Sequence, residues 1–430
     1  MDVLFIGMGY VGTTTALALC QAGHKVTGFD VDKRKIDSLN SGQLYFYEPN
    51  LDEMLIKHLS NKRLLFTTDS KSAIENSDII FITVGTPSLE SGKADLTYVK
   101  AAAKMIGQYM NKEKTVVVKS TVPVGTTEKV KEWIAESKNN HSQVSVAMNP
   151  EFLREGNALE DALYPDRIVI GSKDNKAITD LNNLYQQWSC PIIQTSSQAA
   201  EMIKYASNSF LATKISFINE IARLCDALTI DVNQVAKGMG FDARIGPHFL
   251  QAGLGYGGSC FPKDVRELAT TAFEHGVPLE ILQKVEEVNM NQSQFFLEKV
   301  KKRLGSLRGK KLVILGLSFK PHTDDIRESV SLRLLENLIN EKAQISVHDP
   351  IVKLSSVYLN QGVTQNIYPY EAVKNADAIL LCTDWPHYKN LDWKKIHSLM
   401  NQACVFDGRN MLDADKMKSL HFHYEGIGYS

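Results

Sequence analysis

The stretch VLFIGMGYVG, residues 3–12, decides the fold. Its apolar start, Val3–Ile6, predicts a short buried strand, and the spacing G-x-G-x-x-G follows at Gly7, Gly9 and Gly12. A helical pattern comes directly after the glycines. Such glycines allow a tight turn and a close approach of the backbone to a ligand, and the following helix offers free N–H groups to a pyrophosphate. The stretch therefore predicts a strand, turn and helix that bind a dinucleotide.

An acid closes the next predicted strand, Lys25–Asp30. A carboxylate at this place hydrogen-bonds the hydroxyls of an adenosine ribose, so Asp30 favours NAD over NADP. The competing interpretation is a glycine-rich turn that binds no cofactor. Lys35, one helical turn further on, either contacts the ribose or is a solvated helix lysine.

Outward from this stretch, short apolar runs alternate with helical patterns, which is typical of a parallel, doubly wound sheet. A long helix is predicted over 198–228 and a second over 279–304, with no strand signals between them. Alternation resumes at Lys311. The predicted fold is α/β, with two Rossmann-like doubly wound domains joined by an all-α region. We expect a cofactor domain over 1–197, a helical connector and dimerisation domain over 198–305, and a smaller domain over 306–430. The predicted strands of the first domain are 3–6, 25–30, 64–67, 78–84, 115–119, 144–147 and 168–170.

Composition excludes several classes of function. A chain of 430 residues with net charge −1 has no bulk attraction for nucleic acid or anionic membranes. No run of 18 apolar residues predicts a membrane span. The six cysteines form no CxxC pair, which indicates reduced thiols and a cytoplasmic protein. The histidines are scattered, so no metal site is predicted.

The stretch GLGYGGSCFPKD, residues 253–264, places one cysteine among glycines. Pro262 fits the first turn of a helix, so Cys260 lies just before a helix N-terminus, where partial positive charge lowers the pKa of a thiol. We interpret the glycines as room for a bulky ligand. Asp264, one turn further on, could bind a water or take a proton. For Cys20, Cys225 and Cys404 we expect inert packing.

Other polar residues follow predicted strands or share a helix face. Thr121, in KSTVPVGTT, and Glu151 and Glu155, in NPEFLREG, lie at strand ends, where open α/β sheets bind ligands. Lys204 and Asn208 are spaced i, i+4 and share one face of the long helix. Turn chemistry or solvated side chains explain each of them equally well when taken alone. The same holds for the loop cations Lys320, Arg327 and Arg409.

A dinucleotide site combined with an activated cysteine suggests oxidation beyond the aldehyde. Hydride removal from an alcohol gives an aldehyde, which a thiolate can trap as a thiohemiacetal. Loss of a second hydride gives a thioester, and water releases a carboxylate. Cys260, Lys204 and Asp264 are a nucleophile, a cation for the oxyanion and a carboxylate for proton handling.

Nearly the whole chain resembles the nucleotide-sugar dehydrogenases, the family of UDP-glucose and GDP-mannose dehydrogenases. The matching segments, in the family's order, are FIGMGYVG, VGTP, KSTVPVGT, NPEFLREG, PDRIVIG, GYGGSCFPKD, GLSFKPHTDDIRES, HDP and FDGRN. The resemblance implies NAD on the first domain and UDP on the last. It also implies oxidation of UDP-glucose to UDP-glucuronate with two NADH and one water per turnover.

The resemblance also assigns roles to residues. Cys260 is similar to the thioester-forming nucleophile, and Lys204 and Asn208 are similar to the groups around the reacting carbon. Asp264 and Thr121 resemble the pair that positions water, and Glu151 resembles an acid–base residue. Arg244 resembles an arginine that reaches the substrate of a neighbouring subunit, which implies a homodimer. The NAD contacts would be Gly7, Gly9, Val11, Gly12, Asp30, Lys35, Thr86, Thr121, Glu155, Lys263 and Arg327. The substrate contacts would be Glu151, Phe152, Leu153, Lys204, Asn208, Arg244, Phe249, Leu250, Gln251, Ala252, Gly253, Gly257, Lys320 and Arg409.

Several alternatives stay open at this point. The same chemistry on GDP-mannose, UDP-galactose or a UDP-N-acetylhexosamine is the first, although SCFPKD with PDRIVIG favours UDP-glucose. Tyr256 stands where the family often has phenylalanine, which affects the sugar pocket. A non-catalytic NAD-binding regulator is the second alternative, and a hydroxyacid dehydrogenase that transfers a single hydride is the third.

Overall fold

The computed structural model describes residues 1–429 as two compact units. The first unit comprises Met1–Ser207 and Arg266–His275, and the second comprises Asn208–Val265 and the chain from Gly276 onward. The boundary falls inside helix α9 (Ser197–Leu228), the long helix predicted from the sequence. The three-part division 1–197, 198–305 and 306–430 stays a prediction.

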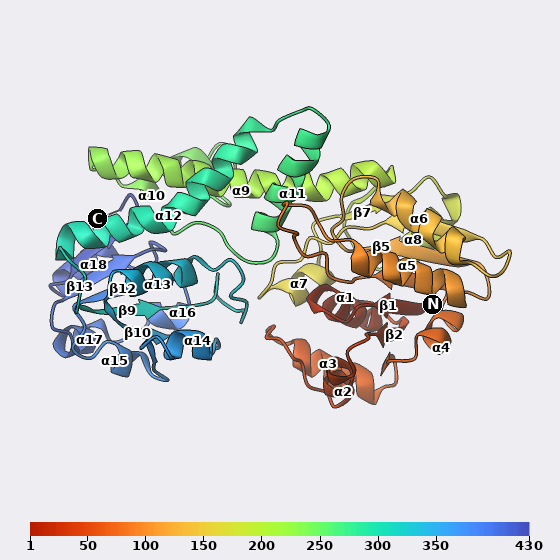
Figure 1. Ribbon diagram of the computed structural model, residues 1–430, viewed down its shortest axis with the longest axis horizontal. Coiled ribbons are helices and arrows are strands. Elements are labelled where there is room, and N and C mark those ends of the chain that lie inside the picture. The colour runs from red at the N-terminus through yellow and green to blue at the C-terminus, as the bar shows by residue number, and fades with distance from the viewer. Residues whose placement is uncertain (430) are drawn as a thin grey trace. The chain divides into compact units, whose positions relative to one another are not determined.

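The first unit is built on an eight-stranded sheet of order β3-β2-β1-β4-β5-β6-β7-β8 (Figure 1). Seven strands were predicted and lie where expected; the structure adds an eighth, β8, which is half-exposed at the sheet edge. The sheet is parallel apart from one antiparallel pairing, between β6 and β7, which corrects the expectation of a wholly parallel sheet. The strands are β1 (Asp2–Ile6), β2 (Lys25–Phe29), β3 (Leu64–Thr67), β4 (Ile79–Ile82), β5 (Lys114–Val118), β6 (Val144–Met148), β7 (Ile168–Gly171) and β8 (Ile192–Thr195).

Alternate residues of these strands bury against helices on both faces of the sheet. Phe5 and Phe81 stack at 4.8 Å and pack with one set of helices, whereas Leu4 and Ile80 pack with the other. Burial on both faces is what the continuous apolar runs of parallel strands predict. The first set is α1 (Tyr10–Gln21), α2 (Lys33–Asn40), α3 (Leu51–Ser60) and α8 (Asn175–Leu184); the second is α4 (Ser70–Glu75), α5 (Thr97–Tyr109) and α6 (Thr126–Ser137). A short helix, α7 (Ala158–Leu163), precedes β7.

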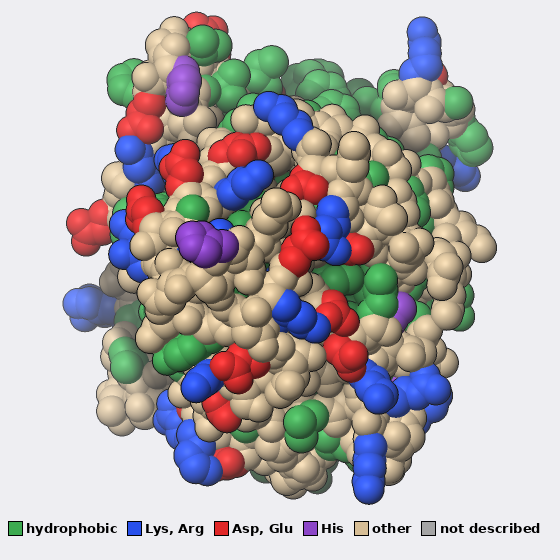
Figure 2. Space-filling model, turned by 90° about the vertical axis from the view of Figure 1, so that its right-hand side faces the viewer, with side chains coloured by type: hydrophobic (Ala, Val, Ile, Leu, Met, Phe, Trp, Pro, Cys, Tyr) green, Lys and Arg blue, Asp and Glu red, His purple; other side chains and the backbone are tan. Residues whose placement is uncertain are grey.

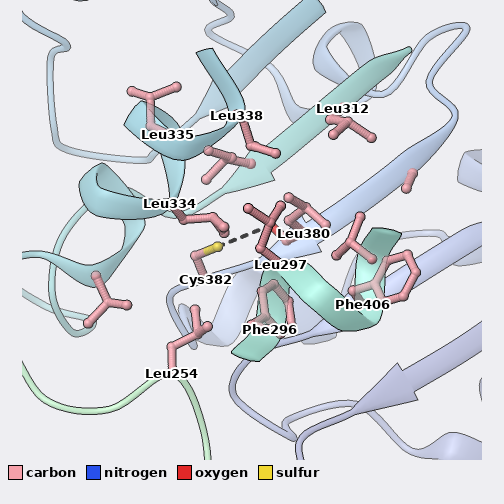
Figure 3. Close-up of a cluster of buried hydrophobic side chains, with 14 of the residues drawn as sticks. Leu254, Phe296, Leu297, Leu312, Leu334, Leu335, Leu338, Leu380, Cys382 and Phe406 are labelled. Carbon is pink, nitrogen blue, oxygen red and sulfur yellow. Dashed lines mark hydrogen bonds between the residues drawn. The ribbon is translucent and has the colours of Figure 1, made fainter. Parts of the chain in front are cut away.

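The second unit carries a six-stranded, all-parallel sheet of order β11-β10-β9-β12-β13-β14. Four strands were predicted, β9 (Lys311–Leu315), β10 (Gln344–His348), β12 (Ala378–Leu381) and β13 (Cys404–Asp407), and the structure adds the edge strands β11 (Thr364–Gln365) and β14 (His423–Gly426). Figure 3 shows the core on one face, where Leu312 and Phe406 of the sheet meet Phe296 of α12 (Glu280–Leu304) and Leu334 of α13 (Val330–Asn340). The other face is covered by α15 (Pro369–Ala372), α16 (Pro386–Lys389), α17 (Trp393–Leu399) and α18 (Ala414–Ser419).

Between the two sheets the chain is helical, as predicted. Helix α9 is followed by α10 (Val232–Gly240), a loop, α11 (Phe261–Glu274) and α12. The remaining helix, α14 (Ser356–Leu359), lies between β10 and β11 in the chain. Within residues 1–429 no helix is long and apolar enough to cross a bilayer. The face in Figure 2 intersperses acidic and basic side chains, in keeping with the net charge of −1.

Candidate active site

The glycine turn after β1 has the form that a bound dinucleotide needs. Gly7 has φ +100°, and a Cβ there would meet the Thr83 carbonyl at 2.9 Å. A Cβ on Gly12 would lie 2.1 Å from the Gly7 oxygen, so this glycine allows helix α1 to pack on the turn. A Cβ on Gly9 would meet nothing within 4 Å. Gly9 thus leaves an open approach to the first turn of α1, which no side chain caps.

Asp30 stands directly after β2, beside this turn. Its carboxylate accepts the backbone N–H of Met8 at 3.0 Å and that of Asp32 at 2.9 Å, and the Lys35 ammonium lies 3.7 Å away. A carboxylate tied to the glycine turn by one oxygen and followed by a lysine can still accept ribose hydroxyls. The residues present therefore fit NAD, as the sequence predicts.

Tyr45 also belongs to this corner, although the sequence analysis did not single it out. Its hydroxyl donates to the carbonyl of Met8, and its ring lies 5.4 Å from the Lys35 ammonium. The side chain is 38% exposed, so part of the ring faces solvent beside Asp30. Sequence gave no signal for it, because the loop over 41–50 has neither strand nor helix periodicity.

A buried carboxylate, Glu48, fixes the loop that carries Glu155. It accepts the Tyr10 hydroxyl and the backbone N–H groups of Gly156 and Ala158, the latter two at 2.7 Å each. Burial is the main cause that raises the pKa of Tyr10 well above its usual range, and the neighbouring Glu48 adds to it. Glu48 thereby ties the start of α1 to the loop before α7.

Two threonines predicted as ligand contacts meet at the carboxyl ends of β4 and β5. The Thr86 hydroxyl donates to the Thr121 carbonyl at 2.9 Å. Val11 is the second residue of α1 and lies within its first turn. These residues, with Asp30 and the glycine turn, lie at the sheet edge where open α/β sheets bind ligands.

Glu151 and Lys204 form a buried ion pair in the first unit. Their side chains are 6% and 3% exposed, and Nζ lies 2.9 Å from Oε1. The other carboxylate oxygen accepts the Leu153 N–H at 2.6 Å. Burial alone would raise the pKa of Glu151, but Lys204, the Leu153 N–H and Lys119 together lower it. The carboxylate is therefore held ionised beside a cation, which suits proton transfer or oxyanion stabilisation.

Two cations of the same unit lie over the ring of Phe152. The Arg167 guanidinium is 3.7 Å from its ring centroid, and the Lys204 ammonium is 5.5 Å away. The predicted contact residues Glu151, Phe152, Leu153 and Lys204 are thus brought together. Arg167 joins them from the quoted segment PDRIVIG, in which the sequence analysis had not singled it out.

In the second unit, Cys260 immediately precedes helix α11, as predicted. Its carbonyl accepts the Asp264 N–H at 2.9 Å, so the first turn is closed. The Ser259 hydroxyl lies 3.6 Å from the Cys260 sulfur, which is partly exposed, whereas Cys20, Cys225 and Cys404 are buried. Burial raises the pKa of Cys20 to about 12. Of these thiols, Cys260 has the position expected of a nucleophile.

Asp264 is 1% exposed, and each of its carboxylate oxygens has a protein partner. Its two oxygens take Nδ2 of Asn208 at 2.6 Å and the ammonium of Lys263 at 2.5 Å. Asn208 stands one turn after Lys204 on α9, so two successive turns of that helix bind the carboxylates Glu151 and Asp264. The i, i+4 spacing of Lys204 and Asn208 thus lets one face of α9 bind both carboxylates.

The glycines before Cys260 pack closely against other segments of the second unit. A Cβ on Gly255 would lie 2.3 Å from Oδ1 of Asn289, and one on Gly257 would lie 2.3 Å from the Glu328 carbonyl. Gly253 and Gly258 are closed in the same way by Gly408 and Phe319. Leu254 between them is buried in the core of this unit (Figure 3). The glycines let the segment pack against its own unit, and the interpretation that they also make room for a ligand stays a prediction.

Arg409 is held by three carbonyls rather than standing open. Its guanidinium donates to the oxygens of Cys382 at 2.7 Å, Gly255 at 3.1 Å and Phe319 at 3.0 Å. It therefore joins three segments of the second unit, including the one before Cys260. Gln251 donates to the Arg409 carbonyl at 2.8 Å, which extends the same network.

The other predicted contact residues of the second unit differ in exposure. The Phe249 ring lies 6.2 Å from Phe261, and the Lys320 ammonium lies 5.3 Å from the Phe319 ring. Leu250 and Ala252 are 4% and 2% exposed. Arg244 and Arg327 are exposed and pair with the aspartates two residues before them at 2.6 Å and 2.7 Å.

Three family models match the chain. They are the NAD binding domain, central domain and UDP binding domain of the UDP-glucose/GDP-mannose dehydrogenase family, over residues 1–189, 198–291 and 313–414. The UDP-glucose 6-dehydrogenase TuaD of Bacillus subtilis is 43% identical, with 99% of this chain and 93% of that protein covered.

Solved structures agree with this match. A UDP-glucose dehydrogenase from Pyrobaculum islandicum superposes with a TM-score of 0.92 at 39% identity. The match covers 100% of this chain and 98% of that chain. A UDP-D-ManNAc dehydrogenase from Pyrococcus horikoshii has a TM-score of 0.89 at 27% identity, with 100% and 99% covered. With the glycine turn and Asp30 of the first unit, these findings identify an NAD-dependent nucleotide-sugar dehydrogenase, and the chain belongs to the UDP-glucose/GDP-mannose dehydrogenase family.

Proposed function

We propose that the protein oxidises C6 of UDP-glucose to the carboxylate of UDP-glucuronate, reducing two NAD and consuming one water per turnover. The observation that carries the proposal is Cys260 at the start of α11, with Asp264 one turn on and bonded to Asn208 and Lys263. Relatives named UDP-glucose 6-dehydrogenase at 43% and 44% identity support UDP-glucose as the substrate.

NAD supplies the hydride acceptor for both oxidation steps. The first step leaves an aldehyde at C6 and releases a proton from the alcohol, for which the Glu151–Lys204 pair is the acid–base and charge-stabilising group. Cys260 then adds through sulfur to the aldehyde carbon, and the resulting thiohemiacetal loses a hydride and a proton to give a thioester. Water attacks this thioester with Asp264 and Thr121 positioning it, and the thiol of Cys260 leaves as the carboxylate forms.

The remaining contacts follow the predicted assignment. We assign NAD to Gly7, Gly9, Val11, Gly12, Asp30, Lys35, Thr86, Thr121, Glu155, Lys263 and Arg327. The sugar nucleotide would meet Phe152, Leu153, Asn208, Lys320, the 249–253 backbone and Gly257. For Arg409 the three carbonyl bonds favour a positioning role, in which its guanidinium holds the loops around the substrate.

A homodimer is part of the proposal. Along α9, Phe210, Phe217, Leu224 and Leu228 are 65%, 46%, 55% and 58% exposed. Their spacing of seven and four residues places them on one side of the helix, and an apolar stripe of this length is unusual on the surface of a monomer. A second copy of the chain would cover the stripe, and Arg244, exposed in the same unit, would reach the partner's substrate.

The test is the number of NADH molecules formed per sugar consumed by the purified protein. We expect two per UDP-glucose, and little turnover of GDP-mannose, UDP-galactose or UDP-N-acetylhexosamines. One NADH per sugar would remove the role of Cys260 and favour a single-hydride dehydrogenase. Two NADH with another sugar would keep the mechanism and refute the substrate, and NAD binding without turnover of any sugar would favour a regulator.

A Cys260→Ala variant sharpens this test. Without the thiol, the thioester cannot form, so net production of UDP-glucuronate should fall at least about a thousandfold while NAD still binds. Cys225→Ala, a change at a buried thiol elsewhere in the same unit, is the control and should retain the wild-type stoichiometry.

A further inference from the structure

Lys119 is a buried lysine for which neither the sequence nor the proposed mechanism gives a use. It is 7% exposed and follows the last residue of β5. Its ammonium donates to Oδ1 of Asn149 at 3.0 Å and lies 3.5 Å from the Asn149 carbonyl. Asn149 begins the segment N-P-E that ends in Glu151. Lys119 therefore binds the backbone of the turn on which Glu151 stands.

Asn149 is itself held on every side. Its Nδ2 donates to the Val169 carbonyl at 2.8 Å, and the Tyr185 hydroxyl donates to its Oδ1 at 2.6 Å. Both ends of the amide are thus engaged, and all these groups are buried. A fully satisfied buried network of this kind defines one geometry for the turn that follows. Lys119 contributes the only cation among these hydrogen bonds of Asn149.

Two charged groups act on Lys119 in this pocket, and both belong to the ion pair already described. Burial lowers the pKa of Lys119 to about 8, Glu151 opposes this shift, and Lys204 adds to it. In return, Lys119 helps to lower the pKa of Glu151. The Tyr185 hydroxyl also binds Asn149. Burial raises the pKa of Tyr185 further above its usual value, so Tyr185 is neutral in this pocket. Glu151 thus has two ammonium groups to stabilise its charge.

We propose that Lys119 is a positioning residue: its ammonium holds the Asn149–Glu151 turn through its hydrogen bonds to Asn149, and it adds a second positive charge to the pocket of the Glu151–Lys204 pair. The inference rests on the proposed function only for the meaning of the ion pair in catalysis. The arrangement itself predicts how Glu151 titrates, whatever sugar is oxidised.

Lys114, at the start of the same strand, provides a matched control. It is also buried, burial lowers its pKa to about 8, and its ammonium donates to the carbonyls of Ser77 at 2.6 Å and Glu75 at 3.2 Å. These hydrogen-bond partners of its ammonium lie outside the candidate site. A change at Lys114 therefore removes a buried lysine from β5 without removing a charge beside Glu151.

The experiment compares Lys119→Met, Lys119→Arg and Lys114→Met with the wild type through the pH dependence of kcat, with UDP-glucose and NAD. We expect Lys119→Met to move the acid limb up by about one pH unit, because a nearby cation typically lowers a carboxyl pKa by 1–3 units. The KM for NAD should stay within about twofold. Lys119→Arg, which restores the charge, should return the acid limb toward the wild type, and Lys114→Met should leave it in place.

A second measurement does not depend on activity. The unfolding free energies of Lys119→Met and Lys114→Met are compared at pH 7 and at about pH 3. The folded-state pKa of Glu151 lies below its usual value, so the charge that Lys119 stabilises is lost only as the pH falls through that lowered pKa. The extra destabilisation of Lys119→Met should therefore be present at pH 7 and shrink at the acid end of this range.

An unchanged acid limb in Lys119→Met, an equal shift in Lys114→Met, or a pH-independent stability difference would each overturn the proposal. Failure of the wild type to oxidise UDP-glucose would refute the proposed function instead. The stability comparison then still decides the role of Lys119.

Discussion

Asp30 and Asp349 occupy equivalent positions in the two units. Asp30 accepts the Met8 N–H at 3.0 Å after β2, and Asp349 accepts the Leu317 N–H at 2.7 Å after β10. Each acid binds the N–H of the residue that follows a glycine of positive φ, Gly7 at +100° and Gly316 at +96°. Threonines close both glycines, because a Cβ would meet Thr83 in one unit and Thr383 in the other. The two sheets thus repeat one local design.

The two acids differ in how many donors they already hold. Asp349 also accepts the N–H groups of Ser318, Ile351 and Val352 and lies 3.3 Å from the indole nitrogen of Trp385. Among residues 1–429, Asp30 accepts the N–H groups of Met8 and Asp32 and pairs with Lys35 at 3.7 Å. The Asp30 carboxylate can therefore still accept hydrogen bonds from ribose hydroxyls, whereas the Asp349 carboxylate already accepts hydrogen bonds from the loops around it.

Asp30→Asn and Asp349→Asn should therefore separate binding from stability. We expect Asp30→Asn to weaken NAD binding about tenfold, since a charge-assisted hydrogen bond contributes about 1.5–3 kcal/mol. Asp349→Asn should lower the free energy of unfolding by about 2–4 kcal/mol, because it leaves buried N–H groups facing an amide. NAD titration by fluorescence and urea unfolding measure the two effects. The same loss of NAD affinity in both variants would show that the acids are not specialised.

Glu201 stabilises the start of α6 from another helix. Its buried carboxylate accepts the N–H groups of Gly125 at 2.6 Å and Thr127 at 2.7 Å, and the Thr127 hydroxyl at 2.6 Å. These are the N–H groups that a helix N-terminus leaves unpaired. Glu201→Gln turns one acceptor into a donor, so we expect a loss of about 2 kcal/mol in urea unfolding. Glu132→Gln, at an exposed position of α6, should change stability by less than about 0.5 kcal/mol.

His348 should make stability depend on pH. It is 4% exposed, and its ring contacts the Tyr388 hydroxyl at 2.9 Å and the Ile367 carbonyl at 3.1 Å. Burial, with a smaller effect of His387, lowers its pKa in the folded state. The unfolded chain binds this proton near pH 6.5, so unfolding takes up a proton below that pH and stability falls as the pH drops.

The variant His348→Gln tests this sign. Between pH 7.5 and 5.5 it should lose about 1 kcal/mol less of its unfolding free energy than the wild type, because one lowered pKa no longer contributes. The control is His275→Gln, at an exposed histidine, which should retain the wild-type slope. Equal slopes in all three proteins would mean that His348 accepts a proton in the folded state.

The elements that sequence predicted well have strong periodicity. The long helix was expected over 198–228 and runs from Ser197 to Leu228, and every central strand was located. The missed strands, β8, β11 and β14, are edge strands, and β8 and β11 include exposed residues. Edge strands bury less apolar surface, so their pattern is weak.

The position of a functional side chain could be predicted only where a single helix or strand determines it. Cys260 before a helix and the Lys204–Asn208 face could be deduced locally. That Lys204 binds Glu151, and that Lys119 binds Asn149, depends on long-range packing. The close packing around the glycines near Cys260 could not be predicted either, because their neighbours Asn289, Glu328 and Phe319 are distant in sequence.

The exposed stripe on α9 gives the sharpest test of assembly. If Phe210, Phe217, Leu224 and Leu228 are covered by a second chain, Phe217→Ser places a hydroxyl in an apolar interface. It should raise the dimer dissociation constant at least about tenfold, which corresponds to about 1.4 kcal/mol. Light scattering over a dilution series measures the mass, from two chains of 48.0 kDa toward one. Phe273→Ser removes a more exposed phenylalanine ring, 72% against 46% for Phe217, from α11 and should leave the mass unchanged. A wild type that is monomeric at micromolar concentration would refute the dimer, and with it the role of Arg244 in a partner's site.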